Sequence, residues 1–350
     1  MKIDDLLNYT SEWLKGTGPH ADIVISSRIR LARNLDKIPF PHWANKKQRE
    51  QALDLIRDAL KKTGYINNKA VLFDLSGLDN VDKQFLIERH LMSYEHAKGQ
   101  DGKAVVIDEE GVLAIMINEE DHLRMQVMQS GFNLFEAWKV ISAIDDALGE
   151  ELSFAFYKEW GYLTACPTNT GTGMRGSVML HLPALVLTRQ ISRVLAAIAK
   201  LRFTSRGLYG EGTEASGNFF QISNQVALGN NEEEMIANIN GLIRQIIEQE
   251  EAGRAALLAQ NRDVLEDRIY RGFGTLRSAH IISSQETIEL LSLLRLGCDL
   301  EIIKNIDRRT INELFILTQP AHLQKIEGRR LSPQERDLKR AELIRRKLGG

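Results

Sequence analysis

The sequence has only two cysteines, Cys166 and Cys298, in 350 residues. A disulfide framework is therefore excluded in practice, and a reducing cytoplasm is the expected compartment. The first residues lack the apolar core of a signal peptide, and no run approaches the roughly 20 apolar residues that span a bilayer. Cysteine and histidine pairs at zinc-ligand spacing are also missing. We expect neither a membrane segment nor a protein-bound metal site.

An excess of charge of one sign is lacking as well. The chain has 45 Lys and Arg against 47 Asp and Glu, a formal net charge of −2. No long-range field would attract nucleic acid or an anionic membrane, so an anion site must be built locally from clustered arginines. A composition that is 43% hydrophobic and 26% charged is ordinary for a globular protein.

The first 250 residues mix strand and helix patterns. The chain is expected to be extended at residues 22–31 and to form a hairpin from residues 103–107 and 112–118. Residues 133–148 have helical periodicity, and Pro183 is expected to open a helix that runs to about Lys200. Further strands are expected at residues 162–165, 177–182 and 219–223.

From Asn231 onward, helix formers dominate. Asn231 and Glu234 have the spacing of a capping box, and Ser332, Pro333 and Glu335 form a second helix start. Shorter helices are expected at residues 286–296 and 311–317, and Gly272-Phe-Gly274 is expected to interrupt the pattern. We therefore predict an α+β catalytic body over residues 1–250 and a helical domain over residues 251–350.

Four charged or glycine-rich clusters stand out in the first part. Arg28 and Arg30 would share one face of a strand, where an anion could lie between them. A glycine-rich loop runs from Cys166 to Arg175, without the pattern of a Walker A loop or of a dinucleotide fingerprint. Acids and an arginine follow a strand at residues 118–124, and Arg206 lies near Glu211. Each cluster alone is better explained by a solvated surface or an ordinary turn, and only their combination favours a functional site.

Together these segments resemble the phosphagen kinases, the family of arginine and creatine kinases. The matching strings are Ser-Ser-Arg-Ile-Arg followed by Ala-Arg-Asn, Asn-Glu-Glu-Asp-His-Leu-Arg, Cys-Pro-Thr-Asn-x-Gly-Thr-x-x-Arg, and Gly-Glu-x-Thr-Glu-Ala leading to Ile-Ser-Asn. They occur in the family's order and cover roughly residues 20–250. The resemblance implies a large antiparallel sheet flanked by helices, with ATP and Mg²⁺ as cofactors and Mg²⁺ held mainly through the ATP phosphates.

The resemblance also implies site residues. Glu120 and Glu211 would orient the guanidinium group and accept its proton, and Cys166 would lie beside it as a thiolate. Glu119 and Asp121 are expected to have a structural role. The implied ATP-binding residues are Ser26, Ser27, Arg28, Ile29, Arg30, His90, Arg124, Arg175, Gly176, Ser177, Val178, Met179, Arg206, Gly207, Leu208, Tyr209 and Gly210. Met179 departs from the family, because small-substrate relatives usually have histidine there.

Two further features are similar to the bacterial protein-arginine kinases. The catalytic motifs begin close to residue 1, and a helical region follows them. Arg336, Asp337, Arg340 and Ala341 match a motif that binds phosphoarginine in those enzymes, although a solvated helix with i,i+4 charge pairs would show the same pattern. The resemblance implies protein substrates, a zinc-binding activator, a Clp protease, and a homodimer or higher oligomer. The alternatives are a kinase of free arginine or another small guanidine, and a degenerate kinase that acts as an adaptor.

Overall fold

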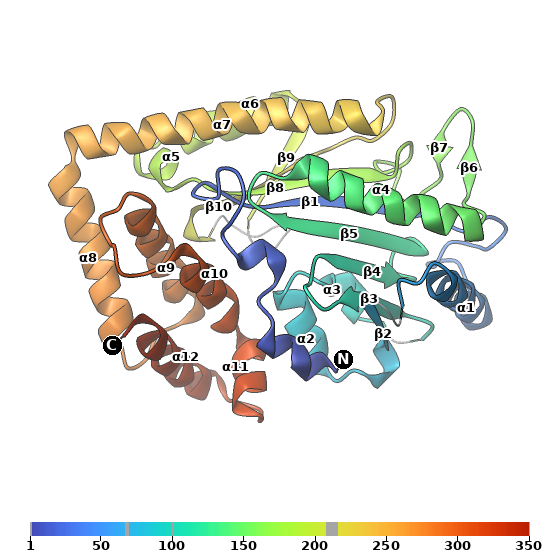
Figure 1. Cartoon of the computed structure of the whole chain (residues 1–350), viewed down its shortest axis with the longest axis horizontal. Helices are drawn as coiled ribbons and strands as arrows, with labels where there is room; N and C mark the ends of the chain where they lie inside the picture. The colour runs from blue at the N-terminus through green and yellow to red at the C-terminus, as the bar shows by residue number, and fades with distance from the viewer. Residues whose placement is uncertain (1, 67–69, 100, 208–215, 350) are drawn as a thin grey trace.

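The computed structural model describes residues 2–66, 70–99, 101–207 and 216–349 (Figure 1). Its centre is an eight-stranded antiparallel sheet with the strand order β2-β3-β4-β5-β1-β8-β10-β9. The strands are β1 (Val24–Arg33), β2 (Ala70–Asp74), β3 (Ala104–Asp108), β4 (Leu113–Ile117), β5 (Leu123–Ser130), β8 (Met174–His181), β9 (Phe203–Arg206) and β10 (Phe219–Asn224). The predicted antiparallel sheet is thus confirmed. A separate hairpin pairs β6 (Phe156–Tyr157) with β7 (Gly161–Tyr162).

Helices cover one face of the sheet completely. They are α1 (Lys46–Lys62), α4 (Leu134–Glu151), α6 (Ile191–Lys200) and the long α7 (Glu232–Gln260). Their apolar side chains meet those of the strands in the largest core of the molecule. Because successive strand residues point to opposite faces, this burial leaves the alternate side chains on the other face of the sheet.

Among the described residues, two groups pack on the second face, one toward each end of the sheet. Over β3 and β4, α2 (Asn80–Glu88) and α3 (Tyr94–Ala97) lie with the N-terminal 3-10 helix at Ile3–Asn8. At the other end, Ile25, Met128, Met179 and Phe219 form a core with the C-terminal helices. Those helices are α8 (Arg262–Ser278), α9 (Ser284–Asp299), α10 (Arg308–Leu317), α11 (Pro320–Glu327) and α12 (Pro333–Leu348). Polar strand residues lie between these two ends.

The expected helix starts are confirmed. The Asn231 side chain accepts from the Glu234 N–H at 2.8 Å, and the Ser332 side chain accepts from the Glu335 N–H at 3.3 Å. Such reciprocal caps satisfy backbone donors that have no partner inside the helix. Helix α7 is continuous through residue 250, so the domain boundary expected at that position falls within a helix.

Three expectations about local structure are wrong. Gly272-Phe-Gly274 lies inside α8, and a Cβ on Gly272 would meet Leu290 and Leu293 of α9 at 3.5 and 3.6 Å, so a small residue suits this contact. The helix expected from Pro183 to Lys200 is two helices, α5 (Pro183–Leu187) and α6, because Arg189 is left-handed at φ 61°. The strand expected at residues 162–165 ends at Tyr162, beyond which the chain turns into a loop.

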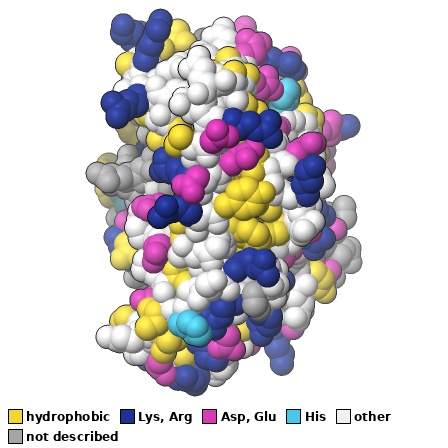
Figure 2. All heavy atoms as spheres, turned by 90° about the vertical axis from the view of Figure 1, so that its left-hand side faces the viewer, with side chains coloured by type: hydrophobic (Ala, Val, Ile, Leu, Met, Phe, Trp, Pro, Cys, Tyr) yellow, Lys and Arg dark blue, Asp and Glu magenta, His cyan; other side chains and the backbone are white. Residues whose placement is uncertain are grey.

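Figure 2 views the C-terminal helices from the left of Figure 1. Acidic and basic side chains are mixed over this face, with a small apolar strip between them. No field of one sign therefore dominates this side of the molecule, as the net charge predicts. None of the helices in the described ranges is long and apolar enough to span a membrane.

Candidate active site

The predicted arginines lie on the second face of the sheet, between the two groups that pack on it. Ile29 and Leu31 of β1 lie in the helix-covered core, so Arg28 and Arg30 point to the opposite face. Arg30 lies opposite Arg175 of β8 in the antiparallel register. The expectation that Arg28 and Arg30 share a face is confirmed, and Arg175 joins them from the next strand.

Arg124 extends this row from β5. Its Nη1 nitrogen lies 2.7 and 2.6 Å from the two carboxylate oxygens of Glu119, and Ser93 donates to the same carboxylate at 2.5 Å. Burial alone would raise the pKa of Glu119, but Arg124 and Ser93 outweigh it and lower the pKa to about 2. Glu119 therefore stays ionised and holds Arg124 in place, which fits the structural role expected for it.

Arg28 and Arg30 lie in an environment where positive charges outnumber negative ones. Burial, followed by the charges of Arg124, Arg175 and Arg206, lowers the pKa of Arg28 to about 9. Burial and the neighbouring guanidinium groups also lower the pKa of Arg30 well below its usual range. Neither residue forms an ion pair with any carboxylate in the part of the chain described, and Arg28 donates to the neutral amide of Gln221 at 2.9 Å. Such a cluster is suited to a polyanion with several oxygens, such as a triphosphate.

Not every residue of the matching strings faces this cluster. Ile29 and Val178 lie in the core beneath the helices, and a Cβ on Gly176 would meet Ile239 of α7 at 2.5 Å. The Ser27 hydroxyl donates to the Gly131 carbonyl at 2.9 Å and accepts from the Asn133 N–H. Side-chain contacts from these four positions to a ligand on the arginine face are therefore excluded. Ser26, Ser177 and Met179 have the strand parity of Arg28.

His90 borders the cluster on the N-terminal side. Its ring meets Trp13 edge to face at 5.3 Å, and Trp13 belongs to the same apolar core as Met179. Burial and the charge of Arg28 lower the pKa of His90 to about 4, so its ring is neutral at pH 7. The neutral ring of His90 thus lies next to the positively charged arginines.

Glu120 lies at the tip of the β4–β5 hairpin. The tip is fixed because Asn118 adopts a left-handed φ of 59° and its side-chain amide donates to the carbonyl oxygens of Arg49 and Gly102. The Glu120 side chain is exposed. Partial desolvation and the neighbouring carboxylates of Asp121 and Glu119 raise its pKa, which moves this carboxyl toward the range of a general base.

A buried polar link joins this tip to the cysteine loop. The Asp121 carboxylate accepts from the side-chain amide of Asn34 at 2.6 Å and from the Ala165 N–H at 2.7 Å. Asn34 also donates to the Leu163 carbonyl at 3.1 Å and accepts from the His122 N–H at 3.0 Å. Asp121 directly follows Glu120, and Ala165 directly precedes Cys166. This link therefore fixes Glu120 and Cys166 relative to each other. The spacing of residues along the sequence gives no sign of it.

Cys166 is partly exposed, and its Sγ lies 3.0 Å from the Thr168 hydroxyl. At the second cysteine, Cys298, burial and the charge of Asp299 raise the pKa of the thiol to about 12. Arg206 lies opposite Gln221 of β10 and contributes to the field at Arg28. Gly207 is buried beside it, and Leu208, Tyr209, Gly210 and Glu211 lie outside the described residues.

On α12, the predicted phosphoarginine motif is only partly open. The Arg340 guanidinium is buried and donates to the carbonyl oxygens of Thr318 and Ile282, both at 2.9 Å, and to the Asp337 carboxylate at 2.5 Å. Ala341 packs in the core of the C-terminal helices. Arg336 and Asp337 remain partly exposed. The structure brings the four residues together, with Arg340 as the support of Asp337.

Comparison with known proteins gives consistent matches. Residues 51–253 match the model of the ATP:guanido phosphotransferase C-terminal catalytic domain, and residues 262–350 match that of the protein-arginine kinase McsB C-terminal domain. The protein-arginine kinase of Halothermothrix orenii is 50% identical over 99% of both chains, and that of Symbiobacterium thermophilum is 50% identical over 97% of this chain and 96% of its own. Among solved structures, lombricine kinase superposes with a TM-score of 0.61 at 25% identity over 72% of this chain and 71% of its own.

Proposed function

The chain belongs to the ATP:guanido phosphotransferases and, within them, to the protein-arginine kinases, and from this we propose how its residues transfer the γ-phosphate of ATP to an arginine side chain of a protein. The observation that carries the proposal is the convergence of Arg28, Arg30, Arg124 and Arg175 on one face of the sheet, beside the Glu120 tip. Arginine forks suit phosphate oxygens, and a carboxylate suits a guanidinium group.

Arg28, Arg30, Arg124, Arg175 and Arg206 bind the triphosphate. Their charges converge on one face, so they neutralise the oxygens of the group in transfer and hold it in line with the acceptor. His90 is neutral, and its ring, supported by the buried Trp13, lies where it could contact the adenine base. Mg²⁺ would be held mainly through the ATP phosphates and water, as is usual at kinase sites.

Glu120 binds the acceptor. A guanidinium group has a pKa above about 12, so its nitrogen must lose a proton as it attacks the phosphorus atom. The raised pKa of Glu120 favours it as the proton acceptor. Glu211 shares this task by its family position. Cys166 contributes negative charge beside the guanidinium group and forms no covalent bond to it.

One assay tests both the phosphorylation of arginine and the role of Glu120 as the proton acceptor. Wild-type protein is incubated with ATP, Mg²⁺ and an unfolded protein, and phosphoarginine, which is acid-labile, is identified by mass spectrometry. Glu120→Gln should lose at least about 1,000-fold in kcat while ATP affinity stays within about twofold, because a general base adds roughly 100- to 10,000-fold. Near-normal turnover in the variant would remove Glu120 from the mechanism. A higher kcat/KM for free arginine than for the protein would support the small-guanidine alternative.

The cellular setting is also a proposal. Phosphorylated proteins would be passed to a Clp protease, with a zinc-binding protein as activator and a homodimer or larger assembly as the working form. Arg336 and Asp337 would bind phosphoarginine on α12, with the arginine contacting phosphoryl oxygens and the aspartate accepting from the guanidinium group. Asp337→Ala should abolish calorimetric binding of phosphoarginine when the active site is blocked. Unchanged binding would return this helix to a purely structural role.

A further inference from the structure

The β6–β7 hairpin exposes an unusual number of aromatic rings. Phe156 is 58% exposed, and Tyr157 and Trp160 are each 54% exposed. Phe156 and Tyr157 are neighbours on one strand, so they point to opposite sides of the ribbon. Lys158 and Glu159 at the turn cancel in charge. The tip is therefore apolar on both sides and has no net charge, which is costly in water unless another apolar group covers it.

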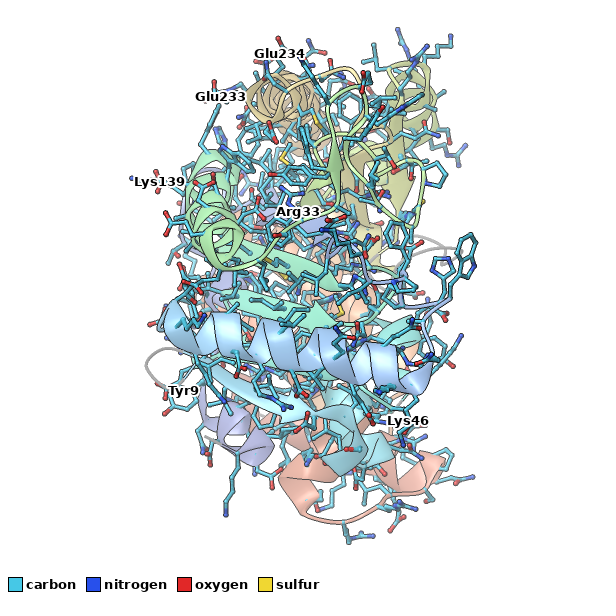
Figure 3. All side chains as sticks on the ribbon, turned by 90° about the vertical axis from the view of Figure 1, so that its right-hand side faces the viewer. Tyr9, Arg33, Lys46, Lys139, Glu233 and Glu234 are labelled. Atoms are coloured by element: carbon cyan, nitrogen blue, oxygen red, sulfur yellow. The ribbon has the colours of Figure 1, made fainter. Side chains whose placement is uncertain are left out.

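The base of this hairpin is rigid. The Arg33 guanidinium lies 3.5 Å from the centre of the Tyr162 ring, and Phe156 meets that ring edge to face at 5.2 Å. Arg33 is itself buried and paired with Asp145 of α4 at 2.6 Å. Figure 3 labels Arg33 in the interior, whereas Lys139 of α4 points outward. Since an isolated two-stranded hairpin is marginally stable, this anchor is what holds the aromatic tip in place.

The hairpin is continuous with the acceptor side of the proposed active site. Its base is hydrogen-bonded to the residue that follows β1, with the Ala155 N–H donating to the Asn34 carbonyl at 2.7 Å. The hairpin then leads through Leu163 into the loop that carries Cys166. Trp160 and Cys166 are six residues apart, which is at most about 20 Å of extended chain at roughly 3.3 Å per residue. Figure 1 shows β6 and β7 standing clear of the sheet at the end away from the C-terminal helices.

We propose that the β6–β7 hairpin is a docking surface for an extended, apolar segment of the polypeptide substrate, within about six residues of the arginine that is phosphorylated. The inference rests on the proposed function, since it assumes that the acceptor is part of a polypeptide. A segment that passes Glu120 and Cys166 reaches the hairpin within the span given above, and an apolar side chain there would cover the exposed rings. The hairpin thereby selects unfolded chains, in which such side chains are accessible.

The test uses two arginine peptides that differ at single positions six residues before and after the arginine, with leucine in one and serine in the other. Wild-type protein should have a KM about tenfold lower for the leucine peptide at equal kcat. The double variant Phe156→Ser/Trp160→Ser should lose this preference and keep the kcat/KM of the serine peptide. Phe135→Ser is the matched control, because Phe135 is 56% exposed at the far end of α4 and should leave the preference intact.

Equal KM values of the two peptides in wild-type protein would overturn the inference, as would loss of the preference in the Phe135 variant. A change in molar mass of the double variant, measured by light scattering, would also overturn it and assign the hairpin to contact between copies of the chain. The dissociation constants of labelled peptides, measured by anisotropy, decide the inference without catalysis. Absence of phosphoryl transfer to both peptides would instead contradict the proposed function.

Discussion

Two groups of arginines differ in how their charge is balanced. On the open face of the sheet, Arg28 and Arg30 have mainly other arginines as charged neighbours. Between the sheet and the helices, Arg254 of α7 pairs with Glu250 at 3.0 Å and with Asp22 at 3.2 Å. In the C-terminal region, Arg295 of α9 lies 3.8 Å from the Asp299 carboxylate and donates to the Asn312 side chain and to the Ala21 carbonyl.

Burial is common to both groups, and charge balance separates them. A buried charge without a counter-charge costs stability, so an unbalanced cluster persists where a ligand completes it. The balanced arginines instead join segments that are distant in sequence. The comparison therefore predicts opposite responses to mutation, with function lost at one group and stability lost at the other.

The largest expected effect is on stability, at Arg254. Arg254→Met keeps much of the side-chain volume but leaves Glu250 buried without its partner. We expect the free energy of unfolding to fall by about 3 kcal/mol, the lower end for breaking a buried pair. Urea denaturation measures it, and kcat and the ATP affinity should stay near wild type. A loss of ATP affinity without loss of stability would contradict the assignment of Arg254 to the structural arginines.

Arg30 should show the reverse pattern. Arg30→Met removes a phosphate partner, and the ATP dissociation constant should rise about 100-fold, equivalent to roughly 2.7 kcal/mol. The stability of the nucleotide-free variant should equal or exceed that of the wild type, because one repelling charge is gone. Calorimetric titration and urea denaturation give the two quantities. A destabilisation as large as that of the Arg254 variant would place Arg30 among the structural arginines.

The link through Asp121 should affect turnover alone. Asp121→Ala frees the Ala165 N–H and should lower kcat about 30-fold with unchanged KM for ATP, because Glu120 and Cys166 are no longer held together. Asp121→Asn keeps an acceptor oxygen and should recover most of kcat. It also removes a charge that raises the pKa of Glu120, so the acidic limb of the kcat–pH profile should move to lower pH.

Two controls separate positioning from folding. The alkylation rate of Cys166, followed by peptide mass spectrometry, should change in Asp121→Ala and not in Asp121→Asn. Glu250→Ala removes a comparably buried carboxylate that accepts the Ala184 and Leu185 N–H groups at 3.0 Å, far from the cysteine loop. It should lose stability without a change in kcat. A fall in kcat of the same size there would reduce Asp121 to general structural importance.

The sequence predicts the arginine face well because strand parity is a local rule. Alternation in β1 is enough to place Arg28 and Arg30 together, and the family strings bring Arg124 and Arg175 to the same face. Parity also explains why the predicted ATP site contains residues that do not face the arginines, since each matching sequence string alternates between the two faces of the sheet. Ile29 and Val178 belong to the core for that reason.

What sequence reasoning missed depends on contacts between distant segments. The Asn34–Asp121–Ala165 link joins three separate parts of the chain, and Arg340 gains its buried partners from residues 282 and 318. Gly272 resembles a helix breaker, yet the close packing of α9 makes a small residue suitable inside α8. The sequence indicates only a strand at residues 162–165 in this region and no aromatic hairpin, because the exposure of its rings is a tertiary property.

The smallest expected effect concerns the stability contributed by Arg28 itself. Its pKa is about 9 in the folded protein against 12.5 ordinarily, so below about pH 9 both folded and unfolded chains carry the charge and the repulsion is fully present. Arg28→Gln, which can still donate to Gln221, should therefore raise the stability of the nucleotide-free protein by about 1 kcal/mol at pH 7.5. Between pH 9 and 12.5 the folded wild type loses the proton before the unfolded chain does, so its stability rises relative to the variant. Urea denaturation at pH 7.5 and pH 10 should show the difference narrowing. A constant difference would mean that the gain comes from packing, whereas a less stable variant at both pH values would show that Arg28 is balanced like Arg254.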